Sequence, residues 1–188
     1  MKKINSRFQI PDSNQGFTLI EAVVATALFA FVVSSIIGVY ISTIQLDRKT
    51  RALRTVAQNA RFISEYLAKE VRNGTIDYGS YSGGLVSGAN DLYLEDQTNT
   101  IEHIYLNGTD LFLDKNGVST NLNTATTQIT NLKFYVSPIG DPYTSTKNYN
   151  EQPHVTMLLE VTSNYGTNNS AKIDLEDTYT TRTYPARQ

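Results

Sequence analysis

The sequence of 188 residues contains no cysteine and no tryptophan, and it has only two histidines. The absence of cysteine excludes disulfide bonds and thiolate metal ligands. The histidines, His103 and His154, lie in or beside segments with strand-like patterns, and they lack the spacing of a zinc motif. We therefore expect both to be surface residues of strands, and we expect no zinc site.

The sequence also lacks the motifs of catalytic and nucleotide-binding sites. The glycines between residues 79 and 88 are not followed by the Lys-Ser/Thr of a phosphate-binding loop, and no Ser/His/Asp arrangement can be argued. Two acidic clusters, Glu95-Asp96 and Asp174/Glu176/Asp177, could supply oxygen ligands to calcium, but their spacing matches no EF-hand loop. A solvated strand edge or turn is the alternative that the spacing favours. We expect no enzymatic activity, no cofactor and no metal.

Charge is distributed unevenly, although the formal net charge is only −2. Residues 1–72 carry ten Lys or Arg against five acids, whereas residues 73–188 carry six against thirteen. Affinity for nucleic acid comes mainly from clustered cations on the phosphate backbone. The acidic distal part is therefore not expected to bind nucleic acid directly.

A long apolar run follows residue 16. Between Phe17 and Leu46 the only charged side chain is that of Glu21. The run exceeds the roughly 20 residues that a membrane-spanning helix needs, and we place the span at about residues 17–45. A carboxylate inside such a span costs about 2.5–3.5 kcal/mol at its centre, which makes Glu21 a candidate functional residue. The alternative is a Glu that reaches to the nearby membrane interface.

After Leu46 the pattern becomes amphipathic, and the helix is predicted to continue to residue 72. Acids four residues before bases predict the ion pairs Asp47–Arg51 and Glu65–Lys69. The apolar positions recur at helical spacing and form one face: Leu53, Val56, Ala60, Ile63, Leu67 and Val71. This face needs a cover, and the domain that follows is the expected one.

The distal part is predicted to be β-rich. Asn73-Gly74 should end the helix, and residues 77–88 read as a loop. Short strand-like segments follow: 91–94, 101–106, 111–114, 129–136, 155–162, 171–175 and 178–184. Asn107-Gly108 predicts a hairpin, Asn116-Gly117 predicts the next turn, and residues 148–153 and 164–169 are expected to form exposed loops. The predicted fold is α+β, with an antiparallel sheet packed on the end of a long helix.

The first 16 residues do not form an ordinary secretory signal. They contain Lys2, Lys3 and Arg7 but no apolar core. An ordinary signal places its apolar stretch before the cleavage site, whereas here the apolar stretch follows Gly16. Cleavage at this point would leave the anchor attached to the protein.

The junction resembles the prepilin processing signal of type IV pilins and type II secretion pseudopilins. The resemblance rests on Gly16, Phe17, Thr18, Leu19, Ile20 and Glu21. It implies cleavage between Gly16 and Phe17 by a prepilin peptidase, which also methylates the new amine of Phe17. It further implies that Glu21 meets the Phe17 amine of a neighbouring subunit, which sets the axial register of a filament. The implied partners are that peptidase/N-methyltransferase, other pilin or pseudopilin subunits, the inner-membrane assembly platform and membrane lipid.

These inferences divide the chain into a leader (1–16), a helix (17–72) and a β-rich pilin domain (73–188). Basic residues flank the apolar run on both sides, so charge alone does not orient it. The resemblance implies a cytoplasmic leader, a single span of the inner membrane and an extracytoplasmic domain, with assembly into a periplasmic or cell-surface filament. Gly38 and the Ser34-Ser35 pair allow two interpretations, either local loosening of the helix or close packing of helices at small residues.

The order of the short strands resembles that of the larger minor pilins and of the J-type minor pseudopilin. The chain also lacks the cysteine pair of many major pilins. We therefore expect a minor structural subunit of a type IV pilus or a type II secretion pseudopilus. The alternative is an unprocessed single-pass membrane protein that displays a β-rich binding or adhesive domain. Secretion, motility and DNA uptake remain open as the role of the system.

Overall fold

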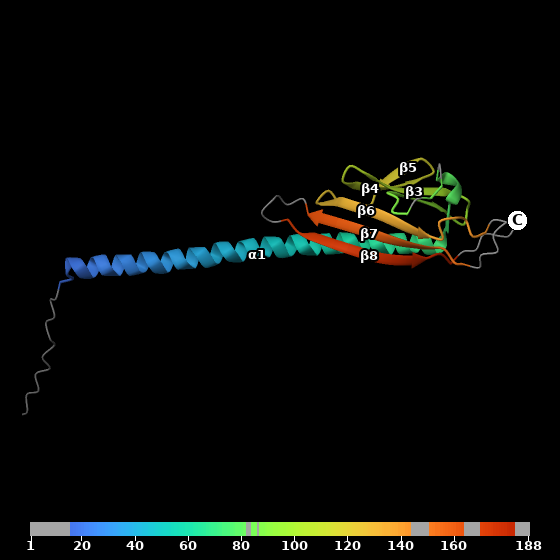
Figure 1. The fold of residues 1–188 in the computed structure, drawn as a ribbon. Coiled ribbons are helices and arrows are strands. Elements are labelled where there is room, and N and C mark those ends of the chain that lie inside the picture. The colour runs from blue at the N-terminus through green and yellow to red at the C-terminus, as the bar shows by residue number, and fades with distance from the viewer. Residues whose placement is uncertain (1–15, 82–83, 86, 144–150, 164–169, 183–188) are drawn as a thin grey trace, which may run out of the picture. The chain divides into compact units, whose positions relative to one another are not determined.

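The computed structural model describes residues 16–81, 84–85, 87–143, 151–163 and 170–182. The chain divides into two compact units, residues 1–44 and 45–188, and helix α1 (Leu19–Asn73) contributes to both (Figure 1). The predicted leader lies outside the described residues except for Gly16, as do the predicted loop 164–169 and the first half of the loop 148–153.

The first unit contains the apolar part of α1. The helix begins at Leu19, two residues later than predicted, because Thr18 caps it. The backbone N–H of Glu21 donates to Thr18 Oγ1 at 3.3 Å, and that of Ala22 donates to the Thr18 carbonyl oxygen at 3.1 Å. The helix continues without a break through Gly38, and nearly all its side chains up to Ile44 are exposed.

In the second unit one face of α1 is buried. The buried residues recur every three or four positions: Ala52, Val56, Asn59, Ala60, Ile63, Leu67 and Val71. The prediction of Leu53 in this stripe is wrong, since its side chain is 41% exposed and Ala52 takes the place instead. One residue corresponds to 100° around a helix, which carries Leu53 past the edge of the buried face. The helix ends at Asn73, immediately before Gly74, as predicted.

The two predicted ion pairs of α1 have different outcomes. Arg51 Nε lies 2.9 Å from Asp47 Oδ2, which confirms the first pair. The second pair is wrong, because Glu65 Oε1 accepts instead from Arg61 Nε at 3.2 Å. Arg61 and Lys69 both lie four residues from Glu65, and Lys69 is drawn away by the carboxylate of Glu70, 3.4 Å from its Nζ. All these groups but Glu70 are largely exposed, so each pair contributes little to stability.

The described residues of the β-rich part form two antiparallel sheets, which confirms the predicted α+β class. Sheet A is a meander in sequence order, and sheet B has three longer strands, also in sequence order. A short 3₁₀ helix, η1 (Tyr78–Ser80), lies inside the predicted loop. The strands of sheet A are β1 (Thr75–Ile76), β2 (Asp91–Glu95), β3 (Ile101–Asn107), β4 (Asp110–Lys115) and β5 (Val118–Asn121). Those of sheet B are β6 (Thr127–Ser137), β7 (His154–Ser163) and β8 (Lys172–Thr180).

Tight turns connect the strands of sheet A. Asn107 pairs with Asp110, which leaves a two-residue hairpin loop that starts at Gly108 with φ +64°. Asn116 and Gly117 join β4 to β5, and both have positive φ, as a type I′ turn requires. Both predicted turns are confirmed. Strand β5 was not predicted, because its four residues are all exposed and show no apolar alternation.

Strand β8 corrects a second expectation. The sequence suggested two strands, 171–175 and 178–184, with a break at Glu176-Asp177. Instead β8 is continuous from Lys172 to Thr180 and pairs with β7 throughout. Asp177 faces α1, where its carboxylate accepts from the Ser64 hydroxyl at 2.5 Å and from the Tyr179 hydroxyl at 3.3 Å. Residues 183 and 184 lie outside the described part.

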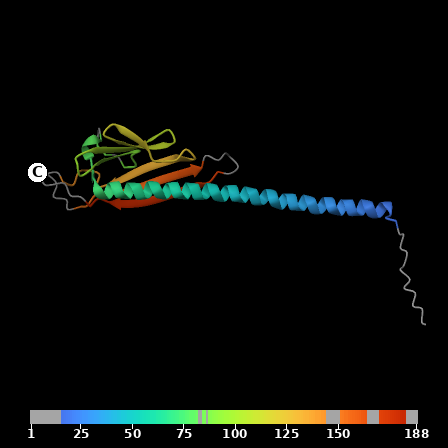
Figure 2. The same cartoon turned by 180° about the vertical axis from the view of Figure 1, so that it is seen from behind.

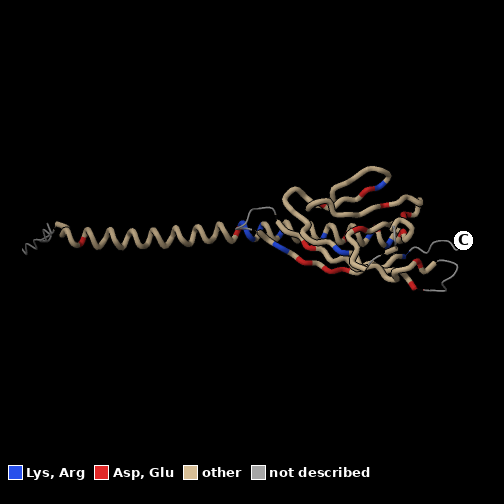
Figure 3. Tube along the Cα trace, turned by 45° about the horizontal axis from the view of Figure 1, so that its top comes forward, with Lys and Arg blue, Asp and Glu red and all other residues tan. Residues whose placement is uncertain are grey.

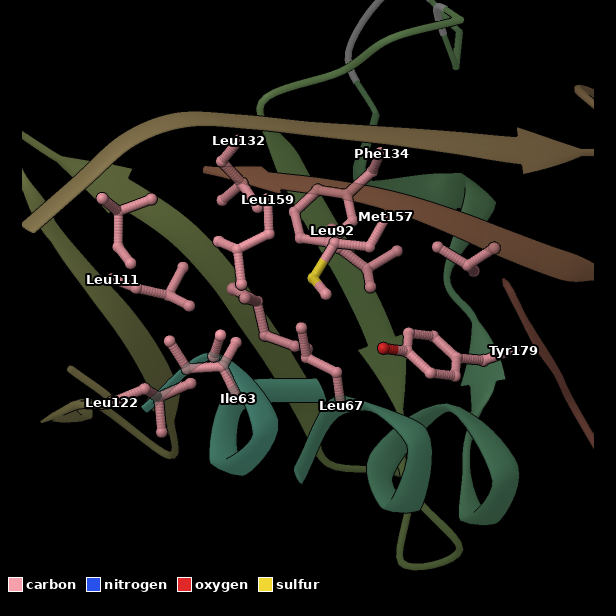
Figure 4. Close-up of a cluster of buried hydrophobic side chains, with 14 of the residues drawn as sticks. Ile63, Leu67, Leu92, Leu111, Leu122, Leu132, Phe134, Met157, Leu159 and Tyr179 are labelled. Atoms are coloured by element: carbon pink, nitrogen blue, oxygen red, sulfur yellow. The ribbon is translucent and has the colours of Figure 1, made fainter. Parts of the chain in front are cut away.

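The hydrophobic core of the second unit lies between α1 and both sheets. Figure 4 shows Ile63 and Leu67 of the helix pointing into a cluster with side chains of the sheets. Strands β7 and β8 run alongside this half of α1 (Figures 1 and 2). The Phe134 N–H donates to the Ala89 carbonyl oxygen at 2.8 Å, which ties sheet B to the segment before β2. The half of α1 in the second unit and the two sheets therefore share one core.

The helix stop at Gly74 gives a testable prediction. A Cβ built at Gly74 would lie 2.9 Å from the carbonyl oxygen of Glu95 and 3.1 Å from that of Glu70, and both are backbone atoms. We expect Gly74→Ala to lower the free energy of unfolding by about 1–3 kcal/mol, because backbone must move to admit the methyl group. Denaturant unfolding followed by circular dichroism measures this loss. Gly16→Ala, whose Cβ meets no atom within 4 Å, is the matched control and should be neutral.

Candidate functional site

The Gly16–Phe17 junction is open in the structure. Gly16, Phe17 and Thr18 precede the first turn of α1, and the Phe17 side chain is 77% exposed. A Cβ at Gly16 would meet no atom within 4 Å, so packing among the described residues does not explain a glycine at this position. The peptide bond that the resemblance marks for cleavage is thus free of packing against the described part of the chain.

Glu21 lies in the first turn of α1. Its backbone N–H is held by the Thr18 side chain, and its carboxylate lies near the positive end of the helix dipole. Within the described residues, no cation pairs with this carboxylate. The capping role of Thr18 was not predicted, although Thr-x-x-Glu before an apolar run is a recognisable N-terminal pattern.

The other polar side chains of the apolar run are mostly satisfied within the helix. Ser34 donates to the Ala30 carbonyl oxygen at 2.8 Å, and Ser35 donates to that of Phe31 at 2.9 Å. Thr26, Ser42 and Thr43 make equivalent bonds to carbonyl oxygens three or four residues earlier. Such bonds suit a lipid environment, where polar groups need partners inside the protein. The carboxylate of Glu21, the hydroxyl of Tyr40 and the amide of Gln45 are the exceptions in the described part of the run.

The carboxylate of Glu21 borders a shallow apolar hollow on the helix surface. The other residues that line it are Ile20, Val24, Ala25 and Leu28. Ala25 forms a low point beside the carboxylate because its side chain is a single methyl group. A second apolar helix could rest against this surface and bring a cation to Glu21.

Both histidines lie on strands, as expected, and one of them makes ring contacts that were not predicted. His154 is exposed at the start of β7. His103 is half-buried on the outer face of sheet A, where its ring stacks between those of Tyr93 and Tyr105, with centroids 4.2 and 4.5 Å away. Its Nε2 lies 3.2 Å from Asp91 Oδ1. The stacking of His103 across neighbouring strands was not predicted.

The acidic clusters have structural partners. Asp96 Oδ1 accepts from the backbone N–H groups of Thr98 and Thr100 in the turn between β2 and β3. In the second cluster, Asp174 lies 3.4 Å from Lys172 Nζ, and Asp177 is bound to Ser64. Among the residues that the structure describes, no group of three or more His, Asp or Glu is placed to hold a metal ion.

A buried ion pair was missed from the sequence. Glu102 of β3 is only 2% exposed, and Lys115 of β4 contacts its carboxylate and also lies 2.8 Å from Asp96 Oδ2. Burial raises the pKa of Glu102, and the ammonium of Lys115 opposes this shift. Lys115, together with the turn hydrogen bonds, holds the pKa of Asp96 well below its usual range. The alternation of β3 puts Glu102 on the face of Ile104, but finding Lys115 requires the register of the hairpin.

The long helix with an exposed N-terminal junction and the antiparallel sheets together match a pilin-like fold. Residues 12–37 match the family model of the prokaryotic N-terminal methylation motif. The match supports a type IV prepilin-like protein, a class of structural subunits that are processed by prepilin peptidase and assemble with other pilins. Helix α1 is long and apolar enough to cross a membrane, which fits a membrane-anchored protein. No curated protein and no solved structure matches the chain.

Proposed function

We propose that the chain is a minor structural subunit of a type IV pilus or a type II secretion pseudopilus. One observation carries the proposal: Glu21 lies without a cation among the described residues, in the first turn of an apolar helix, four residues after an open Gly16–Phe17 bond. The methylation motif covers this same segment. The mechanism is assembly rather than catalysis.

Cleavage after Gly16 would create an α-amine on Phe17. A free α-amine is mostly cationic at neutral pH, and the positive end of its own helix does not favour it there. A carboxylate in apolar surroundings is stable only when it is paired. Pairing the amine of one subunit with Glu21 of its neighbour satisfies both charges. Because only one axial offset of the helices permits this contact, the pair would set the register of the filament.

The remaining parts of the chain follow from this arrangement. Residues 17–45 would span the inner membrane before assembly and form the apolar core of the filament afterwards. The leader would be cytoplasmic and the β-rich domain, 73–188, extracytoplasmic. The absence of a cysteine pair and the order of the strands support a minor rather than a major subunit. Membership of a secretion pseudopilus, with a J-type position, is the more specific form of the proposal.

Mass spectrometry of the protein tests the processing step. In cells with an active prepilin peptidase, we expect the purified chain to begin at Phe17 and to carry one added methyl group on its amine. Gly16→Ala should leave residues 1–16 attached, because the added methyl group meets nothing in the described fold and can act only on recognition by the peptidase.

The unfolding curve of Gly16→Ala provides the control, since unchanged domain stability separates a recognition defect from misfolding. An intact leader on the wild-type chain in such cells would contradict the proposal. That result would favour an unprocessed single-pass membrane protein that displays its β-rich domain.

A further inference from the structure

We propose that Arg48, Lys49 and Arg54 bind the headgroups of anionic phospholipids where α1 leaves the membrane. With Arg51 they form the basic cluster of the helix, four cations within seven residues. Figure 3 shows a group of blue residues directly after a long stretch of α1 that has no Lys or Arg. The proposal requires the membrane span of the proposed function, but neither cleavage nor assembly.

The position of the basic cluster along the helix matches the thickness of a bilayer. From Leu19 to Leu46 the helix has 28 residues, a rise of about 42 Å. A bilayer with its headgroup regions is about 40–45 Å thick. Arg48 therefore lies at the level of the phosphates when Leu19 lies at the opposite interface.

The direction of the side chains favours the same contact. In a helix each Cα–Cβ bond tilts toward the N-terminus, so long side chains reach back along the turn that precedes them. For Arg48 and Lys49 that turn is the end of the apolar run. Their cationic groups can therefore rest at the headgroups while the aliphatic parts lie along apolar surface.

These cations have few competing partners in the protein. Arg51 is paired with Asp47 at 2.9 Å, but no ion pair to Arg48, Lys49 or Arg54 occurs within the described residues. All three side chains are exposed. Of the three cations further along α1, Arg61 pairs with Glu65 and Lys69 with Glu70, which leaves Arg72 without an ion pair within the described residues. Unpaired positive charge is thus concentrated beside the apolar run, where a membrane surface would meet it.

Such a contact would set the depth of the chain in the membrane. Each Lys or Arg near an anionic membrane surface raises the membrane partition coefficient about fivefold, which is equivalent to about 1 kcal/mol. In the proposed orientation, these cations lie on the extracytoplasmic side of the apolar run. Their role in holding headgroups gives a physical reason for basic residues on that side, where the positive-inside rule provides none.

The test uses full-length chain reconstituted in vesicles. Because the protein has no cysteine, Gln45→Cys introduces a single attachment point for a fluorescent donor, on an exposed residue at the end of the apolar run and three residues before Arg48. Energy transfer is measured to acceptor-labelled phosphatidylglycerol and, separately, to acceptor-labelled phosphatidylcholine at the same mole fraction. We expect transfer to favour phosphatidylglycerol by about twofold or more, and high salt to remove the preference.

Two triple variants in the labelled chain separate the basic cluster from general charge. Replacing Arg48, Lys49 and Arg54 by Gln should abolish the lipid preference. Replacing Arg61, Lys69 and Arg72 by Gln removes the same charge from the same helix and should leave the preference unchanged. Equal transfer to the two lipids in the wild-type chain, or equal loss in both triple variants, would overturn the proposal. That outcome would favour an acidic protein surface as the partner of the basic cluster. It would not affect the prediction of cleavage after Gly16.

Discussion

Glu21→Ala is expected to impair incorporation of the chain into filaments by more than tenfold while it leaves membrane insertion intact. Removing the carboxylate takes away a cost of up to about 2.5–3.5 kcal/mol for a charge in the span, so insertion should be unchanged or easier. Assembly, by contrast, would leave the Phe17 amine of a neighbour in apolar surroundings without its partner. Truncating one side of a buried charge pair costs about 2 kcal/mol or more, which predicts a loss of more than tenfold in incorporation.

The structure removes one confounding explanation for this variant. It is the backbone N–H of Glu21, not its carboxylate, that bonds to Thr18, so an alanine retains the cap of the helix. Sheared filaments and membranes are collected separately, and the tagged chain is quantified in each fraction. Glu65→Ala is the matched control, since it removes an exposed acid from the same helix outside the apolar run and should assemble normally. Wild-type incorporation of Glu21→Ala would show that the carboxylate does not set the register.

The parts of the fold that the sequence predicted are those with strong local signals. The apolar run between Phe17 and Leu46 and the helix stop at Gly74 depend on composition and on single residues. The turn at Asn116-Gly117 depends on two residues that tolerate positive φ. Each of these signals is contained within one continuous segment, so no tertiary partner is needed to interpret it.

The errors have different causes, and only one of them involves a partner far away in the sequence. Asp177 suggested a turn because acidic side chains are usually exposed to solvent. Instead Ser64, far away in sequence, donates a hydrogen bond to its carboxylate, and β8 is continuous through this position. Strand β5 has no apolar pattern and forms because β4 offers it an edge across the turn. At the candidate site, the apolar run and Glu21 were evident from the sequence, whereas the Thr18 cap was overlooked. The pairing of helical charges also failed where Glu65 had two equivalent bases.

Lys115→Met is expected to lower the free energy of unfolding by about 3 kcal/mol at neutral pH. The substitution leaves the carboxylate of Glu102, which is 2% exposed, without its cation. Breaking a buried pair by removing one partner costs about 3–5 kcal/mol, and we take the lower end because the side chain of Lys115 is 40% exposed. Denaturant unfolding of the full chain in detergent measures the loss. Glu102→Gln combined with Lys115→Met should recover most of it, since the neutral amide needs no cation.

The pH dependence distinguishes this mechanism from simple loss of packing. Burial already raises the pKa of Glu102, and without Lys115 nothing opposes that shift. A carboxyl group whose pKa is higher in the folded than in the unfolded state favours folding only when it is protonated, so the deficit of Lys115→Met should shrink as the pH falls from 7 to 5. Asp96 acts in the opposite sense in the wild-type chain: Lys115 lowers its pKa, and the stability it contributes is lost as the pH falls below about 4. Acidification should therefore reduce the difference in stability between the two proteins, because it stabilises Lys115→Met through Glu102 and destabilises the wild-type chain through Asp96. A deficit that stays constant between pH 7 and pH 5 would instead mean that Lys115 stabilises the hairpin through its aliphatic part and not through the charge of Glu102.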